Sequence, residues 1–350
     1  MYRQTYMEVY LDNIKNNVEK IINKYNNYDY YFGVVKASCY GLGLDPIKKI
    51  IEAGCNYLAT ATLEEALEIR ELYKDIDIIC FGIVDTNYID LCIKNNITIT
   101  ISNIDYLKEL LLLNPSNLKV HLKINTGMNR LGLKKQEDVD YAYNLLINSN
   151  IYLEGIYSHI YDSKSIENTN NQYKTFEYLT KNIDLNKIKI VHIDASTSLT
   201  TYQKRPYCNG CRLGIIMYGL EDESNDLLST YKLKSRIIQI NEIENESVGY
   251  NANYKTNSKE LIGVVPIGYA DGFIRKNTNG YVYINDKRYK IVCNVCMDML
   301  FVKIDETVKV YDTVELIKDN NHIKEIASHL DTISYEISCS ITKRVPRIYK

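Results

Sequence analysis

A lysine directly follows a short apolar run in the stretch GVVKASCYGLGL, residues 33–44. The run has the length and composition of a buried strand, so we expect Lys36 to lie where that strand ends. A lysine that is partly desolvated among apolar groups has a lowered pKa and a more nucleophilic amine. Such an amine can form a Schiff base with a carbonyl compound. A lone lysine at this kind of position is more often a surface residue with its stem on apolar groups. Neighbouring residues must therefore decide its role.

Polar residues also recur at the ends of later apolar runs. His159, Ser196 and Arg212 each lie at or just after such a run, and Gly214 follows Arg212 by two residues. The parallel strands of a barrel gather their carboxyl ends on one face, where active sites lie and phosphate groups are often bound. A glycine there lets a phosphate approach backbone N–H groups closely. The pattern is compatible with an active site at the carboxyl face of a barrel, and Gly214 would permit a phosphate there.

The elements that would position these residues are apolar runs that alternate with helical patterns from about residue 30 to 220. Segments 63–72 and 103–113 carry apolar residues at helical spacing, and SNID (102–105) offers capping residues to the second. About eight strand–helix units predict an α/β fold with an N-terminal (β/α)₈ barrel, although an open doubly wound sheet has a similar pattern. The expected strands are 32–36, 57–61, 76–82, 97–102, 118–125, 152–160, 189–194 and 211–216.

The pattern changes after about residue 225. Short β-type runs follow one another closely there, separated by turn signals such as TNG and NDK. We therefore expect residues 12–224 to form the barrel, and residues 1–11 with 225–350 to form a second, mostly β domain.

Composition narrows the class of protein. The chain of 350 residues is 45% hydrophobic with a formal net charge of -2, and it has no basic block, which disfavours nucleic acid and anionic membranes as partners. No run has the length of a membrane span or the character of a signal peptide. Nine scattered cysteines favour reduced thiols, so we expect a cytoplasmic protein. The pairs CNGC (208–211) and CNVC (293–296) are too far apart in the sequence for an ordinary zinc site, so no metal is expected.

A family resemblance joins these features. The run VVKASCYGLG (34–43) resembles the pyridoxal-phosphate lysine motif of alanine racemases, and LKINTGMNRLG (122–132) is similar to their segment around a modified lysine and a cofactor arginine. Further matching segments follow in the family's order and span nearly the whole chain: CRLGIIMYG (211–219), VGY (248–250), PIGYADG (266–272), VCMD (295–298), TISYE (332–336) and KRVPR (343–347).

The resemblance implies a racemase that uses pyridoxal 5'-phosphate and supplies D-alanine for peptidoglycan synthesis. Lys36 would hold the cofactor covalently and act as one of two catalytic bases. Tyr250 would be the other base, supplied by the partner subunit of a head-to-tail homodimer. Two bases on opposite faces of a planar carbon permit racemisation, because one removes the α-proton and the other returns a proton.

The resemblance also implies the ligand contacts. Arg212 would face the pyridine nitrogen, His159 would link Arg212 to Tyr250, and His192 would support Arg212. Arg130 would contact the cofactor and the substrate carboxylate, and Lys123 would be a carbamylated lysine whose negative charge holds Arg130. The phosphate would be bound by Tyr40, Ser196, Tyr335 and the backbone of Gly214 and Ile215, while Met297 and Tyr269 would contribute to the substrate site.

Some positions depart from the family pattern. Ser38 and Leu42 stand where Asn and His are common, Asn125 replaces an Asp, and Ala195 replaces an Asn that adds a cofactor contact. The pocket changes near Ser38, Cys39 and Ala195 keep open a serine or broad-specificity racemase of the same fold. A non-catalytic pyridoxal-phosphate-binding barrel is a further alternative, which Tyr250 and the β-rich C-terminal part disfavour. Tyr335 favours alanine, because related serine racemases tend to lack the matching tyrosine.

The remaining histidines have ordinary structural interpretations. His121 alternates within an apolar strand and is expected in the core. His322 and His329 lie at the two ends of a short helical pattern and are expected on the surface.

Overall fold

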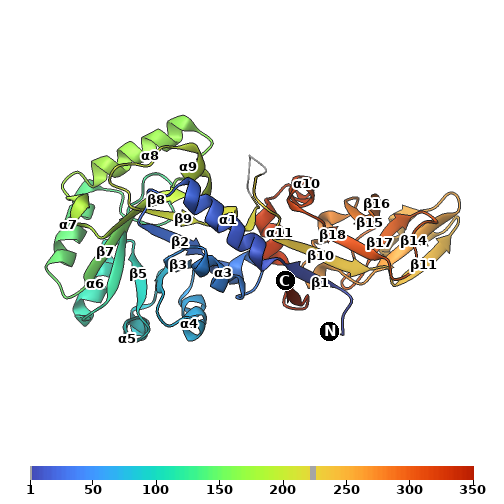
Figure 1. Cartoon of the computed structure of the whole chain (residues 1–350), viewed down its shortest axis with the longest axis horizontal. Coiled ribbons are helices and arrows are strands. Elements are labelled where there is room, and N and C mark those ends of the chain that lie inside the picture. Colours follow the sequence, from blue (N-terminus) through green and yellow to red (C-terminus); the bar gives the residue numbers. More distant parts are fainter. Residues whose placement is uncertain (1, 221–225) are drawn as a thin grey trace. The chain divides into compact units, whose positions relative to one another are not determined.

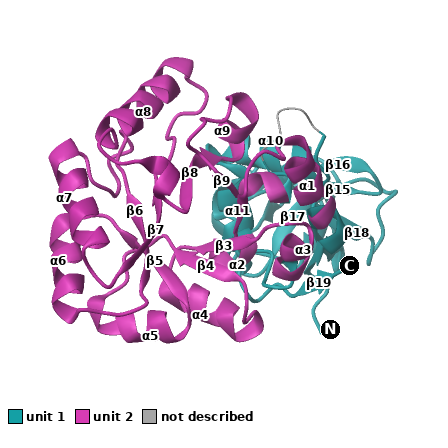
Figure 2. Cartoon of the chain, turned by 60° about the vertical axis from the view of Figure 1, so that its left-hand side comes forward, with its two compact units in different colours: residues 1–14, 40–46, 218–350 teal, residues 15–39, 47–217 magenta. Residues whose placement is uncertain are grey.

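The structure is a computed structural model that describes residues 2–220 and 226–350. The chain divides into two compact units, which Figure 2 shows in different colours. Unit 1 comprises residues 1–14, 40–46 and 218–350, and unit 2 comprises residues 15–39 and 47–217. The boundary expected between residues 224 and 225 lies outside the described residues.

Unit 2 contains a closed barrel of eight parallel strands that pair in chain order, with the last strand pairing with the first. Helices surround these strands in Figure 1. The predicted (β/α)₈ barrel is therefore confirmed, and each expected strand overlaps an observed one. The strands are β2 (Tyr30–Val34), β3 (Tyr57–Thr60), β4 (Asp77–Cys80), β5 (Ile97–Ile101), β6 (Lys119–Lys123), β7 (Tyr152–Tyr157), β8 (Ile190–Ala195) and β9 (Gly210–Leu213).

Side-chain caps mark the starts of two barrel helices. Thr62 and Glu65 form a capping box at the start of α4, and Asn103 accepts the N–H of Tyr106 at the start of α6. The α-helices from the N-terminus to the end of the barrel are α1 (Leu11–Lys24), α2 (Lys36–Tyr40), α3 (Pro46–Glu52), α4 (Leu63–Leu72), α5 (Ile89–Lys94), α6 (Ile104–Leu113), α7 (Gln136–Ile147), α8 (Ile166–Leu179) and α9 (Ser196–Thr201). Short 3₁₀ turns are η1 (Thr86–Tyr88), η2 (Leu185–Lys187) and η3 (Ile215–Tyr218).

Polar side chains fill much of the barrel interior. Strand β5, with the sequence ITITI, alternates isoleucine with threonine, so its two threonines share one face. Thr98 lies 2.6 Å from the Tyr57 hydroxyl, and Thr100 lies 2.9 Å from the Tyr157 hydroxyl. These buried hydroxyls satisfy one another across the barrel, which a polar interior requires.

Unit 1 is built on a nine-stranded sheet in the order β11-β14-β17-β16-β15-β18-β10-β1-β19, with a separate pair, β12-β13. The predicted second, mostly β part of the fold is confirmed. Its strands are β1 (Tyr6–Val9), β10 (Tyr231–Arg236), β11 (Gln239–Ile243), β12 (Ser247–Val248), β13 (Tyr254–Lys255), β14 (Glu260–Val265), β15 (Tyr281–Ile284), β16 (Lys287–Val292), β17 (Leu300–Ile304), β18 (Thr313–Ile317) and β19 (Arg347–Tyr349). The helical elements are α10 (Asn320–Leu330), α11 (Ser334–Ser340), η4 (Tyr250–Ala252), η5 (Tyr269–Asp271) and η6 (Arg275–Asn277).

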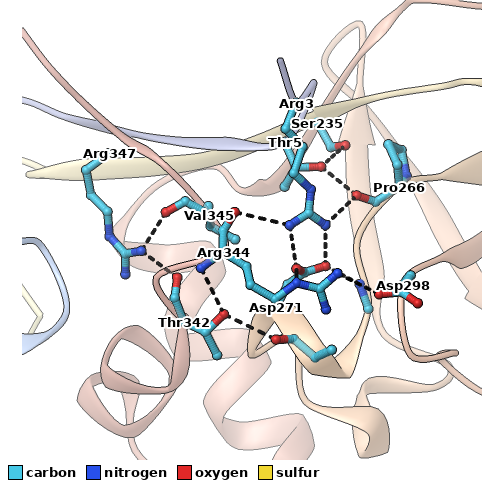
Figure 3. Close-up of polar contacts among 12 residues, drawn as sticks. Arg3, Thr5, Ser235, Pro266, Asp271, Asp298, Thr342, Arg344, Val345 and Arg347 are labelled. Carbon is cyan, nitrogen blue, oxygen red and sulfur yellow. Dashed lines mark hydrogen bonds and ion pairs between the residues drawn. The ribbon is translucent and has the colours of Figure 1, made fainter. Parts of the chain in front are cut away.

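A network of arginines and aspartates holds the loops of unit 1 (Figure 3). Arg3 donates to both carboxylate oxygens of Asp271, at 2.5 Å each, and Asp271 also accepts the N–H of Gly268. Arg344 donates to Asp298 at 2.8 Å and lies 3.5 Å from Asp271. A bidentate arginine–carboxylate pair has a defined geometry, so the network fixes the turn 268–272 and the loop that ends at Asp298.

One sequence interpretation was wrong. His322 is buried, because its ring packs edge-on against Tyr283 with centroids 4.8 Å apart and its Nδ1 accepts the N–H of Lys318. Within residues 2–220 and 226–350, no cluster of three His, Cys, Asp or Glu side chains could hold a metal ion. No helix in these same residues is both long enough and apolar enough to span a membrane.

Candidate active site

The backbone that follows Lys36 has an unusual conformation. Four consecutive residues, Ala37 to Tyr40, have φ between 50° and 56°, which makes a left-handed turn directly after the lysine. This region costs a non-glycine residue roughly 1 kcal/mol. The carboxylate of Glu65 accepts the N–H of Ala37 at 2.7 Å and the N–H of Ala61 at 2.8 Å. Glu65 therefore ties the start of the turn to the end of the neighbouring strand β3.

Lys123 ends β6 and is buried inside the barrel. Its Nζ lies 4.3 Å from the centre of the Tyr157 ring. Burial, together with the positive charges of Arg212 and Arg130, holds the pKa of Lys123 well below its usual value. No carboxylate of the described residues forms an ion pair with Lys123, so nothing offsets this lowering, and the protonated form is disfavoured.

Arg212, on β9, is buried, and its guanidinium donates hydrogen bonds to uncharged acceptors. Its guanidinium lies 2.7 Å from His192 Nδ1 and 3.1 Å from His159 Nδ1. It also donates to the carbonyls of Ser158 at 2.9 Å and Ile193 at 2.6 Å. Because a guanidinium has only donors, both histidine Nδ1 atoms must be unprotonated acceptors.

His159 lies just beyond β7, and several positively charged side chains act on its pKa. Burial lowers its pKa well below the usual value, and the charges of Arg212, Lys123, Arg130 and Lys36 lower it further, in that order. His159 is therefore neutral with its proton on Nε2. The predicted residues Lys36, Lys123, Arg130, His159 and Arg212 form one electropositive site at the carboxyl face of the barrel.

A second group at this face has small polar donors. The N–H of Gly214, just after β9, lies 3.3 Å from Oγ of Ser196, the first residue of α9. Ile215 follows at the start of η3. Backbone N–H groups and a hydroxyl of this kind suit the oxygens of a phosphate.

Unit 1 brings two other predicted residues together. The Tyr40 ring packs against Tyr218, with centroids 5.2 Å apart, and against Tyr335, with centroids 6.4 Å apart. The next residue, Gly41, has φ of 89°, and an added Cβ would lie 2.2 Å from a backbone oxygen, so only glycine fits. Arg347 donates to the Gly41 carbonyl through two nitrogens, at 2.8 and 3.0 Å.

The remaining predicted residues are exposed on unit 1. Tyr250 begins η4 and its side chain is 68% exposed. Tyr269 and Met297 lie on adjoining loops, since the N–H of Ala270 donates to the Met297 carbonyl at 3.0 Å. Both side chains are also exposed. The two adjoining loops therefore expose large apolar side chains at the surface of unit 1.

Sequence reasoning missed two residues of the barrel site. Tyr157 contacts Lys123 and stacks on His192, with ring centroids 4.7 Å apart and planes 3° apart. Tyr157 lies two residues before His159, so a strand places both side chains on the same side. This spacing was the signal in the sequence that could have identified Tyr157. Glu65 gave no signal beyond its capping pattern, because its bond to Ala37 joins residues that are 28 apart in the sequence.

Comparisons with known proteins agree with this arrangement. The family model described as the alanine racemase N-terminal domain matches residues 9–222, and the model described as the alanine racemase C-terminal domain matches residues 230–349. The chain belongs to the alanine racemase family. An alanine racemase of Halalkalibacterium halodurans is 35% identical over 371 residues, covering 99% of this chain and 95% of that protein. Alanine racemase 1 of Bacillus subtilis is 32% identical, covering 99% of this chain and 93% of that protein.

Solved structures of alanine racemases have the same fold. The enzyme from E. faecalis superposes with a TM-score of 0.95 at 31% identity, covering 100% of this chain and 99% of that one. The enzyme from Bacillus anthracis with bound L-Ala-P has a TM-score of 0.93 at 30% identity, covering 100% and 96%. A histidine racemase from Leuconostoc mesenteroides has a TM-score of 0.88 at 22% identity, covering 100% and 98%, which shows the fold alone. The alanine racemase fold therefore does not by itself specify the amino acid.

Proposed function

We propose that this chain is an isomerase that interconverts L-alanine and D-alanine with pyridoxal 5'-phosphate. The observation that carries the proposal is that Lys36, His159 and Arg212 lie together with two further basic side chains, Lys123 and Arg130, in a barrel of the alanine racemase family. D-alanine made by such an enzyme, in the cytoplasm, would serve peptidoglycan synthesis.

The residues present suit pyridoxal phosphate. The site offers a primary amine, a hydroxyl with a neighbouring backbone N–H, and several buried or converging positive charges that require an anion. Lys36 would hold the cofactor, Ser196, Gly214 and Ile215 would bind its phosphate, and Arg212 would face its ring nitrogen. Tyr40 and Tyr335 are proposed as further phosphate ligands. When bound, the cofactor makes the α-proton of an attached amino acid acidic enough to transfer.

Lys36 and Tyr250 are proposed as the two bases. Racemisation needs a proton acceptor on one face of the α-carbon and a donor on the other. Lys36 belongs to unit 2 and Tyr250 is exposed on unit 1. We infer that the β-rich part, residues 1–11 and 225–350, supplies Tyr250 to the site of a second copy in a homodimer. The exposed side chains of Tyr269, Met297 and Met299 favour such self-association.

Arg212 and His159 would set the protonation of the site. A guanidinium beside the ring nitrogen disfavours a proton on that nitrogen by like-charge repulsion. His159 accepts from Arg212 through Nδ1 and therefore carries its proton on Nε2, where it can donate to an oxygen. The oxygen proposed is the hydroxyl of the partner's Tyr250, whose basicity this bond would tune.

The substrate carboxylate would be bound by Arg130 and the backbone N–H of Met297. Arg130 lies on the loop after β6, in a small pocket that Lys123, Thr126, Ser158 and His159 also line. We propose that the neutral amine of Lys123 takes up CO₂ as a carbamate, with release of one proton. The new anion would fix the Arg130 guanidinium by charge-assisted hydrogen bonds.

The deciding experiment is α-proton exchange in heavy water. Purified protein, pyridoxal phosphate and L-alanine should give D-alanine that carries deuterium at Cα, detected by NMR and chiral analysis. Lys36→Ala should abolish both this exchange and the covalent retention of cofactor after borohydride. Racemisation at the parental rate by Lys36→Ala would overturn the assignment.

The same assay separates the alternatives. Exchange with serine or larger amino acids, but none with alanine, would assign a racemase of different specificity, and relative kcat/KM values would rank the substrates. No exchange with any amino acid would leave a binding barrel. Tyr335, which packs against Tyr40, favours alanine over serine.

A further inference from the structure

Two buried histidines continue inward from Arg212 through the barrel. His192, on β8, accepts from Arg212 through Nδ1 at 2.7 Å, and its Nε2 lies 3.0 Å from Nδ1 of His121 on β6. The Nε2 atom of His121 lies 3.4 Å from Oε2 of Glu154 on β7. All four side chains are buried. They form a continuous row from the proposed cofactor site to a carboxylate deep in the barrel.

The direction of this row follows from hydrogen-bonding chemistry. Arg212 can only donate, so His192 Nδ1 must accept. A neutral His192 then carries its proton on Nε2 and donates to His121 Nδ1. A neutral His121 in turn carries its proton on Nε2, facing Glu154. Both hydrogen bonds of the row therefore point toward the carboxylate, which lies 3.4 Å from His121 Nε2.

The charges of the groups agree with this direction. Burial lowers the pKa of His192 well below its usual value, with Arg212 adding to the effect, and burial also lowers the pKa of His121, so both rings are neutral. Burial would raise the pKa of Glu154, but contacts with His121, Lys189 and Tyr57 outweigh it and keep the carboxyl ionised. Glu154 is thus an anion that can only accept.

The barrel is built to hold these rings in place. The His192 ring stacks on Phe32 at 4.5 Å and on Tyr157 at 4.7 Å. Gly155 makes room for His121, because a Cβ there would lie 2.7 Å from a ring atom. The oxygen Oε2 of Glu154, which faces His121, also accepts from Tyr57 at 2.7 Å and from Thr98 at 3.3 Å, whereas Oε1 accepts from Lys189 at 2.8 Å. His121 Nε2 approaches Glu154 Oε2 at 3.4 Å without forming an aligned hydrogen bond, and it has no hydrogen-bond partner among the described residues.

We propose that Glu154 and His121 are positioning residues for Arg212. Glu154 fixes the tautomer of His121, His121 fixes that of His192, and His192 thereby presents a lone pair that holds the guanidinium at the cofactor ring nitrogen. The role at the cofactor rests on the proposed function, whereas the direction of the row can be tested without turnover.

Glu154→Gln should reverse the row. The ammonium group of Lys189 can only donate, so the oxygen of the new side-chain amide must face Lys189. The NH₂ group of this amide then faces His121. His121 Nε2 must then accept, which moves its proton to Nδ1. His192 must then accept from His121 through Nε2, so its proton moves to Nδ1. There the ring N–H faces the N–H groups of Arg212, and neither side can accept a hydrogen bond.

The measurement is ¹⁵N NMR of ring nitrogens in protein labelled only at histidine, with pyridoxal phosphate bound. The chain has five histidines, so single histidine variants can assign every signal. The parent should show protonated Nε2 and unprotonated Nδ1 in both His121 and His192. In Glu154→Gln both assignments should exchange, the absorption band of the bound cofactor should shift, and kcat/KM for alanine should fall about tenfold or more.

Two further variants separate positioning from general damage. Glu154→Gln combined with Lys189→Met removes the demand for the amide oxygen, so the amide can turn and both tautomers should return to the parental state. Glu8→Gln is the matched control, because Glu8 is a buried carboxylate that also accepts from a tyrosine and from lysines. It should lower stability while the His192 signals stay in place.

The possible results separate the direction of the hydrogen bonds in the row from the proposed enzymatic function. Protonated Nδ1 on either histidine in the parent would overturn the inference without any variant. Unchanged tautomers and an unchanged cofactor band in Glu154→Gln would also overturn it. A parent that shows the expected tautomers but exchanges no amino acid would contradict the proposed function and leave the row itself supported.

Discussion

At the scale of single residues, Lys123 has the most demanding position. A buried ammonium with two arginines nearby and no carboxylate is unfavourable. These surroundings lower the pKa of Lys123. A neutral amine can attack CO₂, whereas an ammonium cannot. The departure at Asn125, where the family has an Asp, leaves one negative charge fewer on this loop.

The carbamate can be observed directly. With ¹³C-labelled bicarbonate at pH 8, we expect one protein-bound carbamate carbon by ¹³C NMR, because the lowered pKa of Lys123 favours the neutral, reactive amine. The signal should disappear as the pH is lowered, since protonation of the amine releases CO₂. Lys123→Gln should lack the signal and should raise KM for alanine, because Arg130 loses its anchor. A spectrum without this carbon in the parent at pH 8 would contradict the modification.

At the scale of elements, the left-handed turn after Lys36 carries strain that its surroundings must balance. Glu65 contributes by accepting the Ala37 N–H, and it also caps α4. The two roles can be separated, because Thr62 takes part in the cap through its hydroxyl but does not contact Ala37.

Thr62→Ala and Glu65→Ala should therefore differ in one property. Each removes a helix-capping interaction and should lower stability by about 1 kcal/mol. Only Glu65→Ala frees the backbone next to Lys36, so only this variant should weaken pyridoxal phosphate binding, by roughly tenfold if about 1.4 kcal/mol of positioning is lost. Fluorescence titration of the cofactor against each protein measures the difference. Equal affinities for the two variants would show that Glu65 is a cap alone.

The elements also show what the sequence could predict. Strand positions followed from apolar runs, and α6 begins at the expected capping residues 102–105. The left-handed turn did not follow, because Ala, Ser and Cys have no preference for positive φ and tertiary contacts such as Glu65 impose it. His121 was expected in the core and is buried, but its contacts with His192 and Glu154 join residues far apart in the sequence. Such pairings depend on the closure of the barrel.

At the scale of the whole molecule, Glu8 links both ends of the chain within unit 1. Its carboxylate lies 2.8 Å from the ammonium groups of Lys234 and of Lys350, and it accepts from Tyr10 at 2.7 Å. Burial acts to raise its pKa, but these partners outweigh burial and lower it to about 2. Strand β1 lies between β10 and β19, so this carboxylate ties together the N-terminal, C-terminal and central parts of the sheet.

The pH dependence of stability should report this carboxylate. Because its folded pKa is below its unfolded value, Glu8 stabilises the fold above pH 4.5, and the contribution is lost as the pH falls toward 2. A shift of this size corresponds to about 3 kcal/mol. Urea unfolding should show Glu8→Gln below the parent at pH 7, with the gap narrowing between pH 4.5 and 2. A gap that does not change with pH would assign the loss to packing.

The last question at this scale is whether one chain makes a complete site. Tyr250 is 68% exposed on unit 1, whereas Lys36 lies at the carboxyl face of the barrel. If a second copy supplies Tyr250, then Lys36→Ala and Tyr250→Phe should each be inactive as homodimers. Hybrid dimers of the two would contain one site with both parental bases and one site with neither. Mixing under conditions of subunit exchange should therefore restore up to about a quarter of the parental activity, since about half of the dimers are hybrids with one intact site each. A double variant mixed with the parent provides the control, because its hybrids contain no site with both bases. Verified exchange without recovered activity would mean that each chain completes its own site.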